Sequence, residues 1–173
     1  MGKPTYLGLL NSIAVNEKKG EQFLNAWADA TDDEQLEAAL RFVAIREGEH
    51  AWAFTKRMCE LGYGVSEKDA FNVFQDFDAL MSCVTSDACD ADKVAFVTAG
   101  IGERGEEGER TDPFASFFND TTIDPETGAL LGRYVCEERD SGRRLQAEYD
   151  RIAKGRSESA SELDELRACI EAL

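Results

Sequence analysis

The chain has 173 residues, 43% of them hydrophobic, which is enough for one domain with a substantial core. Its 35 acidic and 19 basic residues give a formal net charge of −16 at pH 7. We therefore expect neither nucleic acid nor an anionic membrane as a partner. The five cysteines are odd in number and include no Cys-x-x-Cys pair, which argues against a disulfide framework and a four-cysteine metal site.

The composition of the chain indicates a helical protein, and its hydropathy indicates that no segment spans a membrane. Only three prolines occur, and the helix formers Ala, Leu, Glu and Arg dominate the composition, so we expect an all-α fold. No apolar run approaches the length of a membrane span, and the N-terminal stretch lacks a basic leader with a cleavage site. We therefore expect a soluble, cytoplasmic protein.

Two long helices are predicted at the start of the chain. Residues from about 6 to 30 carry apolar side chains at helical spacings, and a second stretch with the same property ends at about 61. The turn 31–33 separates them and supplies an N-cap, and the sequence Gly62-Tyr63-Gly64 ends the second helix. These features predict an antiparallel hairpin.

Shorter helices are predicted next. Ser66 is expected to open a third helix, whose Phe71, Phe74 and Phe77 are spaced by three and pack into the core. Residues 93 to about 110 look helical, although glycines at several positions weaken that helix.

One more long helix is predicted in the last third of the chain. Pro125 is well placed near its start, and its apolar stripe continues to about residue 153. Residues 155–159 are expected to form a linker. The stripe at 163–173 predicts a short terminal helix that docks on the body or on a partner.

Acidic residues interrupt the apolar stripes in the first hairpin. Glu47 and His50 continue the stripe of the second helix one turn apart, and Glu17 interrupts the stripe of the first helix. A buried carboxylate without a partner is costly, so each of these groups needs one. Glu17 lies 14 residues before Thr31 and Glu47 lies 16 residues after it, so the hairpin brings the two acids to a similar height.

The second half of the chain repeats this arrangement. Glu103 lies 17 residues before Asp120, and Glu137 lies 17 residues after it. Each hairpin thus offers an acid from its first helix and a short ligand pair from its second. Such a donor set can hold two cations in a bundle core, because several carboxylates balance the charge and imidazole completes the shell without adding any.

The pattern resembles the ferritin-like superfamily and, within it, the rubrerythrin-type di-iron domain. Residues 47–51 (EGEHA) and 56–58 (KRM) are similar to that family's first Glu-x-x-His helix and its flank. Residues 99–106 (AGIGERGE) resemble its third-helix segment, and residues 137–140 (EERD) occupy the place of the second Glu-x-x-His. The resemblance covers roughly residues 6–153.

The resemblance implies a non-haem di-iron protein with peroxidase- or ferroxidase-type redox chemistry on peroxide or dioxygen. Iron is the implied metal, with manganese and zinc as the other candidates. The implied metal ligands are Glu17, Glu47, His50, Glu103, Glu106, Glu137 and Asp140, with Glu47 and Glu137 bridging and Glu106 able to exchange with Glu103. Asp140 departs from the family pattern, which has histidine there. No rubredoxin-like module is present, so the electron donor would be external.

The expected architecture is an all-α, ferritin-like four-helix bundle made of two antiparallel hairpins, a crossover with a short helix, and a C-terminal helix. Residues 1–155 would form the di-iron bundle, and residues 156–173 the linker and the amphipathic C-terminal helix, whose stripe suggests a homodimer. Two other readings remain open. The chain could be a ferritin-like scaffold or interaction module with a degenerate or absent metal site. It could instead bind a single metal, such as zinc, through Glu17, Glu47 and His50.

Overall fold

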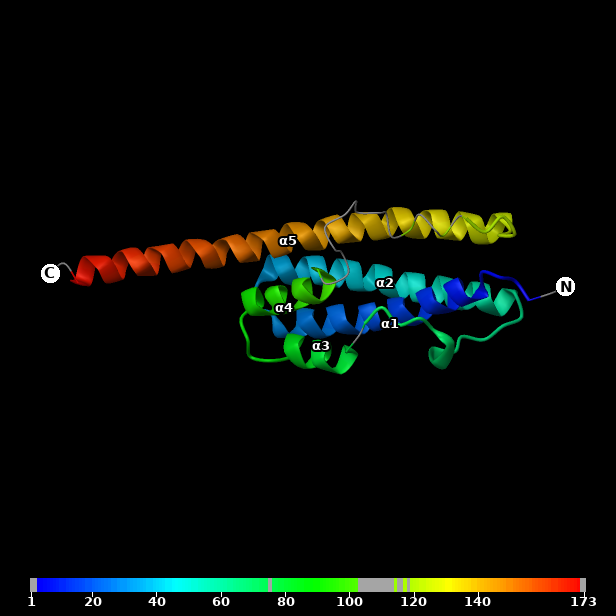
Figure 1. Ribbon diagram of the computed structural model, residues 1–173, viewed down its shortest axis with the longest axis horizontal. Helices are drawn as coiled ribbons and strands as arrows, with labels where there is room; N and C mark the ends of the chain where they lie inside the picture. The colour runs from blue at the N-terminus through cyan, green and yellow to red at the C-terminus, as the bar shows by residue number, and fades with distance from the viewer. Residues whose placement is uncertain (1–2, 75, 103–113, 115–116, 118, 172–173) are drawn as a thin grey trace.

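The computed structural model describes residues 3–74, 76–102, 114, 117 and 119–171, with the side chains of 100–102 and 158–171 left out of the description. The described part of the chain is helical and contains no strand, which confirms the all-α prediction (Figure 1). Its elements, in chain order, are α1 (Leu7–Ala30), α2 (Glu34–Glu60), the 3₁₀ turn η1 (Glu67–Asp69), α3 (Phe77–Val84), α4 (Asp90–Gly102) and α5 (Pro125–Glu171). Within these residues, no helix has both the length and the apolar character needed to cross a membrane.

Helices α1 and α2 form the predicted antiparallel hairpin and pack along their lengths (Figure 1). The carboxylate of Asp33 caps α2 by accepting hydrogen bonds from the backbone N–H groups of Gln35 and Leu36. At the other end of α2, Gly62 adopts a φ of +86°, a left-handed conformation that favours glycine. The predicted boundaries of both helices are therefore confirmed to within a residue or two.

Helix α5 begins at Pro125, as expected for proline in a first turn, and runs antiparallel to α2. Polar contacts fix this direction. Arg57 near the end of α2 binds Asp124 just before α5, whereas Arg46, earlier in α2, binds Asp140, later in α5. In Figure 1, α5 lies beside α2 over its first part and then extends beyond the hairpin.

The apolar core is divided into two clusters along the hairpin. One surrounds Trp27, which is fully buried and stacks on Tyr149 with a ring-centroid distance of 5.6 Å. The other surrounds Phe54 and Tyr134, whose rings lie 5.2 Å apart and meet edge to face. Three helices contribute polar side chains that gather apart from these apolar clusters: Glu17 from α1, Glu47 and His50 from α2, and Glu137 and Glu138 from α5. We call these five residues the polar layer, and they form the candidate site.

Two local predictions were wrong. The stretch after Ser66 forms only η1 and then an irregular segment, and α3 begins at Phe77, capped by the carboxylate of Asp76. Phe71, predicted to pack in the core, is 75% exposed, because its backbone N–H and C=O are used in hydrogen bonds with Ser12 and Asn16 instead of in a helix. These bonds from α1 hold the segment extended.

The predicted linker at 155–159 is also helical, since α5 continues through it without interruption. A single glycine costs a helix about 1 kcal/mol relative to alanine, and good helix formers surround Gly155. The glycine alone is therefore too weak to end the helix. The predicted helix at 93–110 is present as α4 up to Gly102, and residues 103–110 lie outside the described part of the chain.

Candidate metal centre

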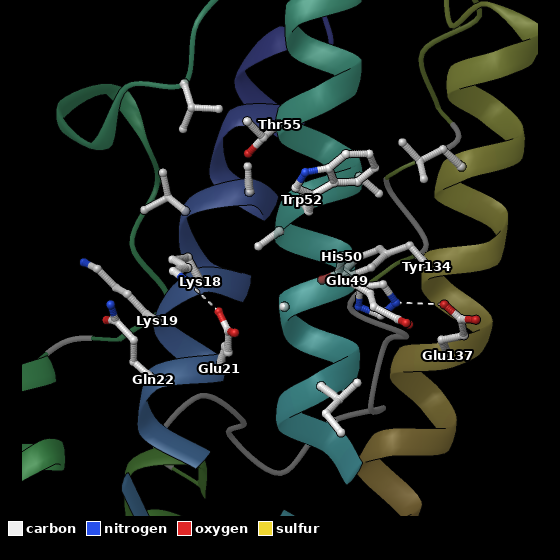
Figure 2. Close-up of a pocket in the computed structure, with 18 of the residues that line it drawn as sticks. Lys18, Lys19, Glu21, Gln22, Glu49, His50, Trp52, Thr55, Tyr134 and Glu137 are labelled. Atoms are coloured by element: carbon white, nitrogen blue, oxygen red, sulfur yellow. Dashed lines mark hydrogen bonds and ion pairs between the residues drawn. The ribbon is translucent and has the colours of Figure 1, made fainter. Parts of the chain in front are cut away.

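The only histidine of the chain lies at the centre of the polar layer. His50 is 5% exposed on α2, and its ring points towards α5 (Figure 2). Its Nε2 lies 2.9 Å from Glu137 Oε2, and its Nδ1 lies 3.1 Å from Glu17 Oε2. Nδ1 is also 3.3 Å from Glu138 Oε1. Carboxylates from α1 and α5 therefore converge on one imidazole from α2.

The electrostatic environment of His50 favours its charged form. Burial by itself lowers the pKa of His50, but its contacts with the carboxylates of Glu138, Glu17 and Glu137 outweigh burial and raise the pKa to about 10. The imidazolium donates through two N–H groups, whereas three carboxylates surround it. One of these carboxylates must therefore lack a good hydrogen bond from His50.

Glu17 and Tyr134 link α1 to α5 beside the histidine. Glu17 is 5% exposed, and its Oε1 accepts a 2.8 Å hydrogen bond from the Tyr134 hydroxyl. The Tyr134 ring also meets the His50 ring edge to face, with centroids 5.0 Å apart. Burial and the charges of Glu17 and Glu138 raise the pKa of Tyr134. Tyr134 therefore packs in the apolar core and also positions Glu17.

Glu47 reaches the same layer from α2. Burial, the charges of Glu17 and Glu138, and a hydrogen bond with Glu17 raise the pKa of Glu47 well above its usual value. The structure thus brings together Glu17, Glu47, His50 and Glu137, as the sequence predicted.

Glu138 is the member of the site that the sequence analysis missed. Its side chain is 18% exposed, and its Oε1 is buried and has no hydrogen-bond partner among the described residues. Burial is the main reason that the pKa of Glu138 is raised, and His50 partly opposes this effect. The signal was present in the sequence, because Glu138 follows Tyr134 by four residues and precedes the buried Ser141 by three, which places it on the buried stripe of α5.

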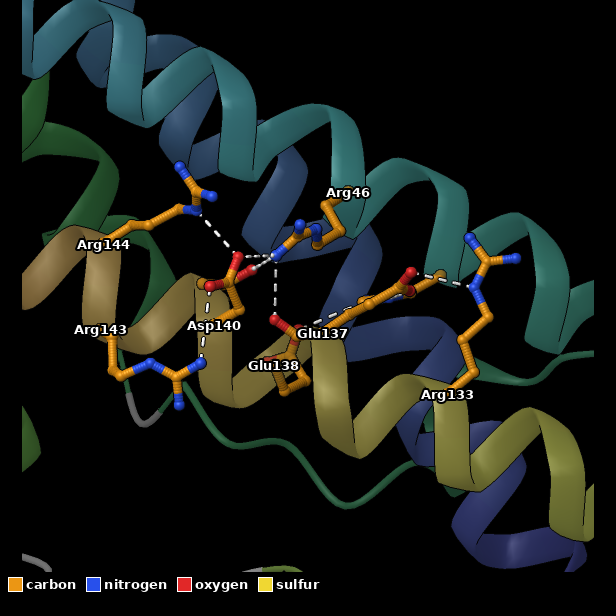
Figure 3. Close-up of polar contacts among 9 residues, drawn as sticks. Arg46, Arg133, Glu137, Glu138, Asp140, Arg143 and Arg144 are labelled. Atoms are coloured by element: carbon orange, nitrogen blue, oxygen red, sulfur yellow. Dashed lines mark hydrogen bonds and ion pairs between the residues drawn. The ribbon is translucent and has the colours of Figure 1, made fainter.

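Asp140, predicted to complete the second ligand pair, lies elsewhere. Its carboxylate pairs with Arg46 at 2.9 Å, Arg144 at 2.8 Å and Arg143 at 3.5 Å (Figure 3). Hydrogen bonds from Arg144 and Arg46 lower the pKa of Asp140 to about 2. Successive residues of a helix point about 100° apart, so Asp140 is turned well away from the direction of Glu138. The predicted ligands Glu103 and Glu106 lie outside the described residues.

The donor set suits a divalent cation. Ligand atoms of Glu17, His50 and Glu138 all lie within 4.8 Å of one another. Glu47 and Glu137 adjoin this group through their contacts with Glu17 and His50. Among the described residues the layer holds four carboxyl groups and one imidazolium, and Arg133 pairs with Glu137 at 3.0 Å from the edge of the layer. A 2+ ion would offset the remaining negative charge and give Glu138 Oε1, which has no hydrogen-bond partner among these residues, an atom to bind.

Cavities reach this layer from two sides. One, of about 1140 Å³, is lined by His50 and Glu137 together with the exposed Trp52 (Figure 2). The other, of about 860 Å³, is lined by Glu17, Glu47 and Glu138 and by apolar side chains. A small solute could therefore approach the carboxylates without unfolding of the bundle.

Comparisons with protein-family models, with curated proteins and with solved structures found no significant match to this chain.

Proposed function

We propose that the protein binds iron in the polar layer and belongs to the ferritin-like, rubrerythrin-type class of di-iron proteins. One observation carries the proposal: the carboxylates of Glu17, Glu137 and Glu138 converge on the only histidine, and the buried Glu138 Oε1 has no hydrogen-bond partner among the described residues. Glu47 adjoins this group beside Glu17. Buried carboxylates in such excess are costly unless a cation compensates them. Iron is favoured because mixed carboxylate and imidazole ligands from bundle helices are typical of di-iron sites.

The proposed ligands follow from the contacts. Glu17, His50 and Glu138 would hold one ion, and Glu47 and Glu137 would extend the site towards a second. Bound iron would supply electrons for the reduction of peroxide or dioxygen by alternating between its ferrous and ferric states. Tyr134 holds the Glu17 carboxylate in place, and an external donor would return the electrons.

The four-helix, ferritin-like architecture is part of the same proposal. Helices α1 and α2 would be the first hairpin and α5 the last helix, and these three elements supply all five side chains of the site. Helix α4 would be the start of the third. The homodimer implied by the C-terminal stripe also remains a proposal.

Metal analysis of protein produced with added iron tests this function. We expect about two irons per chain, lost together in the double variant Glu47→Ala/His50→Ala. Glu49→Ala is the matched control, because Glu49 is an exposed acid on the same helix and has no place in the layer. Protein that binds no metal, with a double variant that folds as the wild type does, would contradict the proposal and favour a scaffold.

A single-metal site is the second candidate, and the position of Asp140 favours it. The Asp140 carboxylate forms ion pairs with Arg46 and Arg144, so the second ligand pair predicted from the sequence is incomplete on α5. A stoichiometry close to one metal per chain, abolished by Glu138→Ala, would support a site built on Glu17, His50 and Glu138.

A further inference from the structure

Helices α1 and α2 meet through two glycines that face carboxylates in a reciprocal way. Gly20 of α1 is buried against the side chain of Glu47 on α2. Gly48 of α2 lies against the side chain of Glu21 on α1. The two contacts have the same form, but only Glu47 belongs to the proposed metal centre.

The backbone does not explain the glycine at position 20. Among the described residues only Gly62 has a positive φ, so alanine could adopt the helical conformation that Gly20 has. Alanine is also the better helix former in a helix interior. The structural reason for Gly20 is therefore space and not conformation.

A methyl group at position 20 would overlap the Glu47 carboxylate. A Cβ built there would clash with Glu47 Oε2 and lie 3.1 Å from the carboxyl carbon, whereas the Cγ, at 3.5 Å, would be in ordinary contact. The clash thus falls on the end of a flexible side chain and not on the backbone. The Glu47 carboxylate can rotate away at little expense to the fold, but it would then leave its position beside Glu17.

We propose that Gly20 is a positioning residue of the metal centre, whose missing side chain leaves room for the Glu47 carboxylate. The inference rests on the proposed function, because it assumes that Glu47 binds metal. It adds a residue that offers no ligand atom and acts only through Glu47. It also explains why a helix that would be stronger with alanine contains glycine at this point.

Titration of Mn²⁺ into purified protein, with free Mn²⁺ counted by electron paramagnetic resonance, tests the proposal. Gly20→Ala should bind Mn²⁺ about 10- to 100-fold more weakly than the wild type, or lose one ion per chain, since displaced supports of a metal site change affinity by such factors. Its melting temperature should be unchanged or higher. If Gly20 had only a structural role, Gly20→Ala would bind Mn²⁺ as the wild type does and would have a lower melting temperature.

Gly48→Ala is the matched control. Its Cβ would meet Glu21 Oε1 at 2.8 Å, a similar clash, but Glu21 is paired with Lys18 at 2.6 Å and is 29% exposed. This variant should bind Mn²⁺ as the wild type does. In a Glu47→Ala background, Gly20→Ala should have no further effect on Mn²⁺ affinity, because the group through which it acts is gone.

The outcomes separate the two proposals. If the wild type binds Mn²⁺ and Gly20→Ala binds it equally well, Gly20 has no positioning role and the metal function stands. The same conclusion follows if Gly20→Ala weakens binding by the same factor with and without Glu47. A wild type that binds neither Mn²⁺ nor iron overturns both proposals.

Discussion

The Tyr134 hydroxyl donates a 2.8 Å hydrogen bond to Glu17 Oε1, joining α5 to α1 beside the only histidine. We expect Tyr134→Phe to keep the ring contacts and lower the free energy of unfolding by about 1.5–3 kcal/mol, the usual range for a bond to a charged group. Denaturant unfolding measures this change. Tyr149→Phe, in the other apolar cluster, should leave metal affinity unchanged, whereas Tyr134→Phe should reduce it.

Glu47→Gln should make the metal-free protein more stable at pH 7. The pKa of Glu47 is raised in the folded state, so its ionised form opposes folding above the pKa of the unfolded chain. We expect the melting temperature to rise by roughly 2–4 °C for each kcal/mol relieved. The advantage of the variant in melting temperature should become smaller as the pH falls towards the pKa of Glu47 in the unfolded chain, because Glu47 is then protonated in both the folded and the unfolded state.

Scanning calorimetry of the metal-free protein at several pH values checks this prediction. The exposed Glu49→Gln variant should show no such gain. A lower melting temperature for Glu47→Gln at pH 7 would mean that the carboxylate is already compensated without metal.

A pair of α5 variants distinguishes the site seen in the structure from the one predicted by sequence. Glu138→Gln should weaken Mn²⁺ binding by at least about tenfold, since it removes a charged ligand from the cluster. Asp140→Asn should leave the affinity nearly unchanged, because the Asp140 carboxylate binds arginines. Isothermal titration calorimetry of both variants measures the two Mn²⁺ affinities. A large loss of affinity for Asp140→Asn and none for Glu138→Gln would mean that Asp140 is the ligand.

The contact between Arg57 and Asp124 should make stability depend on pH in acid. Partial burial favours protonated Asp124, but hydrogen bonds from Thr127, Tyr6 and Arg57 outweigh it and lower the pKa of Asp124. A lowered folded pKa stabilises the fold above the unfolded pKa of about 3.8, and this stability is lost as the pH falls through the folded value.

Urea unfolding of the wild type and of Asp124→Asn between pH 6 and pH 2 measures this effect. The variant should be less stable at pH 6, and its unfolding free energy should change less with pH in the acid range. Parallel curves for the two proteins would show that Asp124 contributes nothing to the acid transition.

The first hairpin and most of its site residues could be predicted because local rules decide them. The stripe through Leu40, Val43, Glu47 and His50 has helical spacing, and the short turn at 31–33 fixes the register between α1 and α2. Glu137 was predicted by its position three residues after Tyr134 and by its distance along the chain, and its carboxylate contacts His50.

The predictions that failed depend on contacts between residues that are far apart in the sequence. The choice between Glu138 and Asp140 depends on rotation of α5 about its own axis, which the arginines of α2 and α5 help to set. The extended segment around Phe71 is held by Ser12 and Asn16 of α1, more than fifty residues earlier. Spacing within α5 places Glu138 on the buried stripe of that helix, but it does not show these contacts with residues far away in the sequence.

The polar contacts between α5 and the first hairpin also determine how the helices can move. Arg57 with Asp124, His50 with Glu137 and Arg46 with Asp140 lie at successive heights, and Arg151 binds Asp33 further along. Apolar stripes alone would pack almost as well after a slide of a turn or two, since their spacing repeats. Such a slide would break all of these contacts together, so α5 has one favoured axial position, and a ligand that needs another must displace the whole set at once.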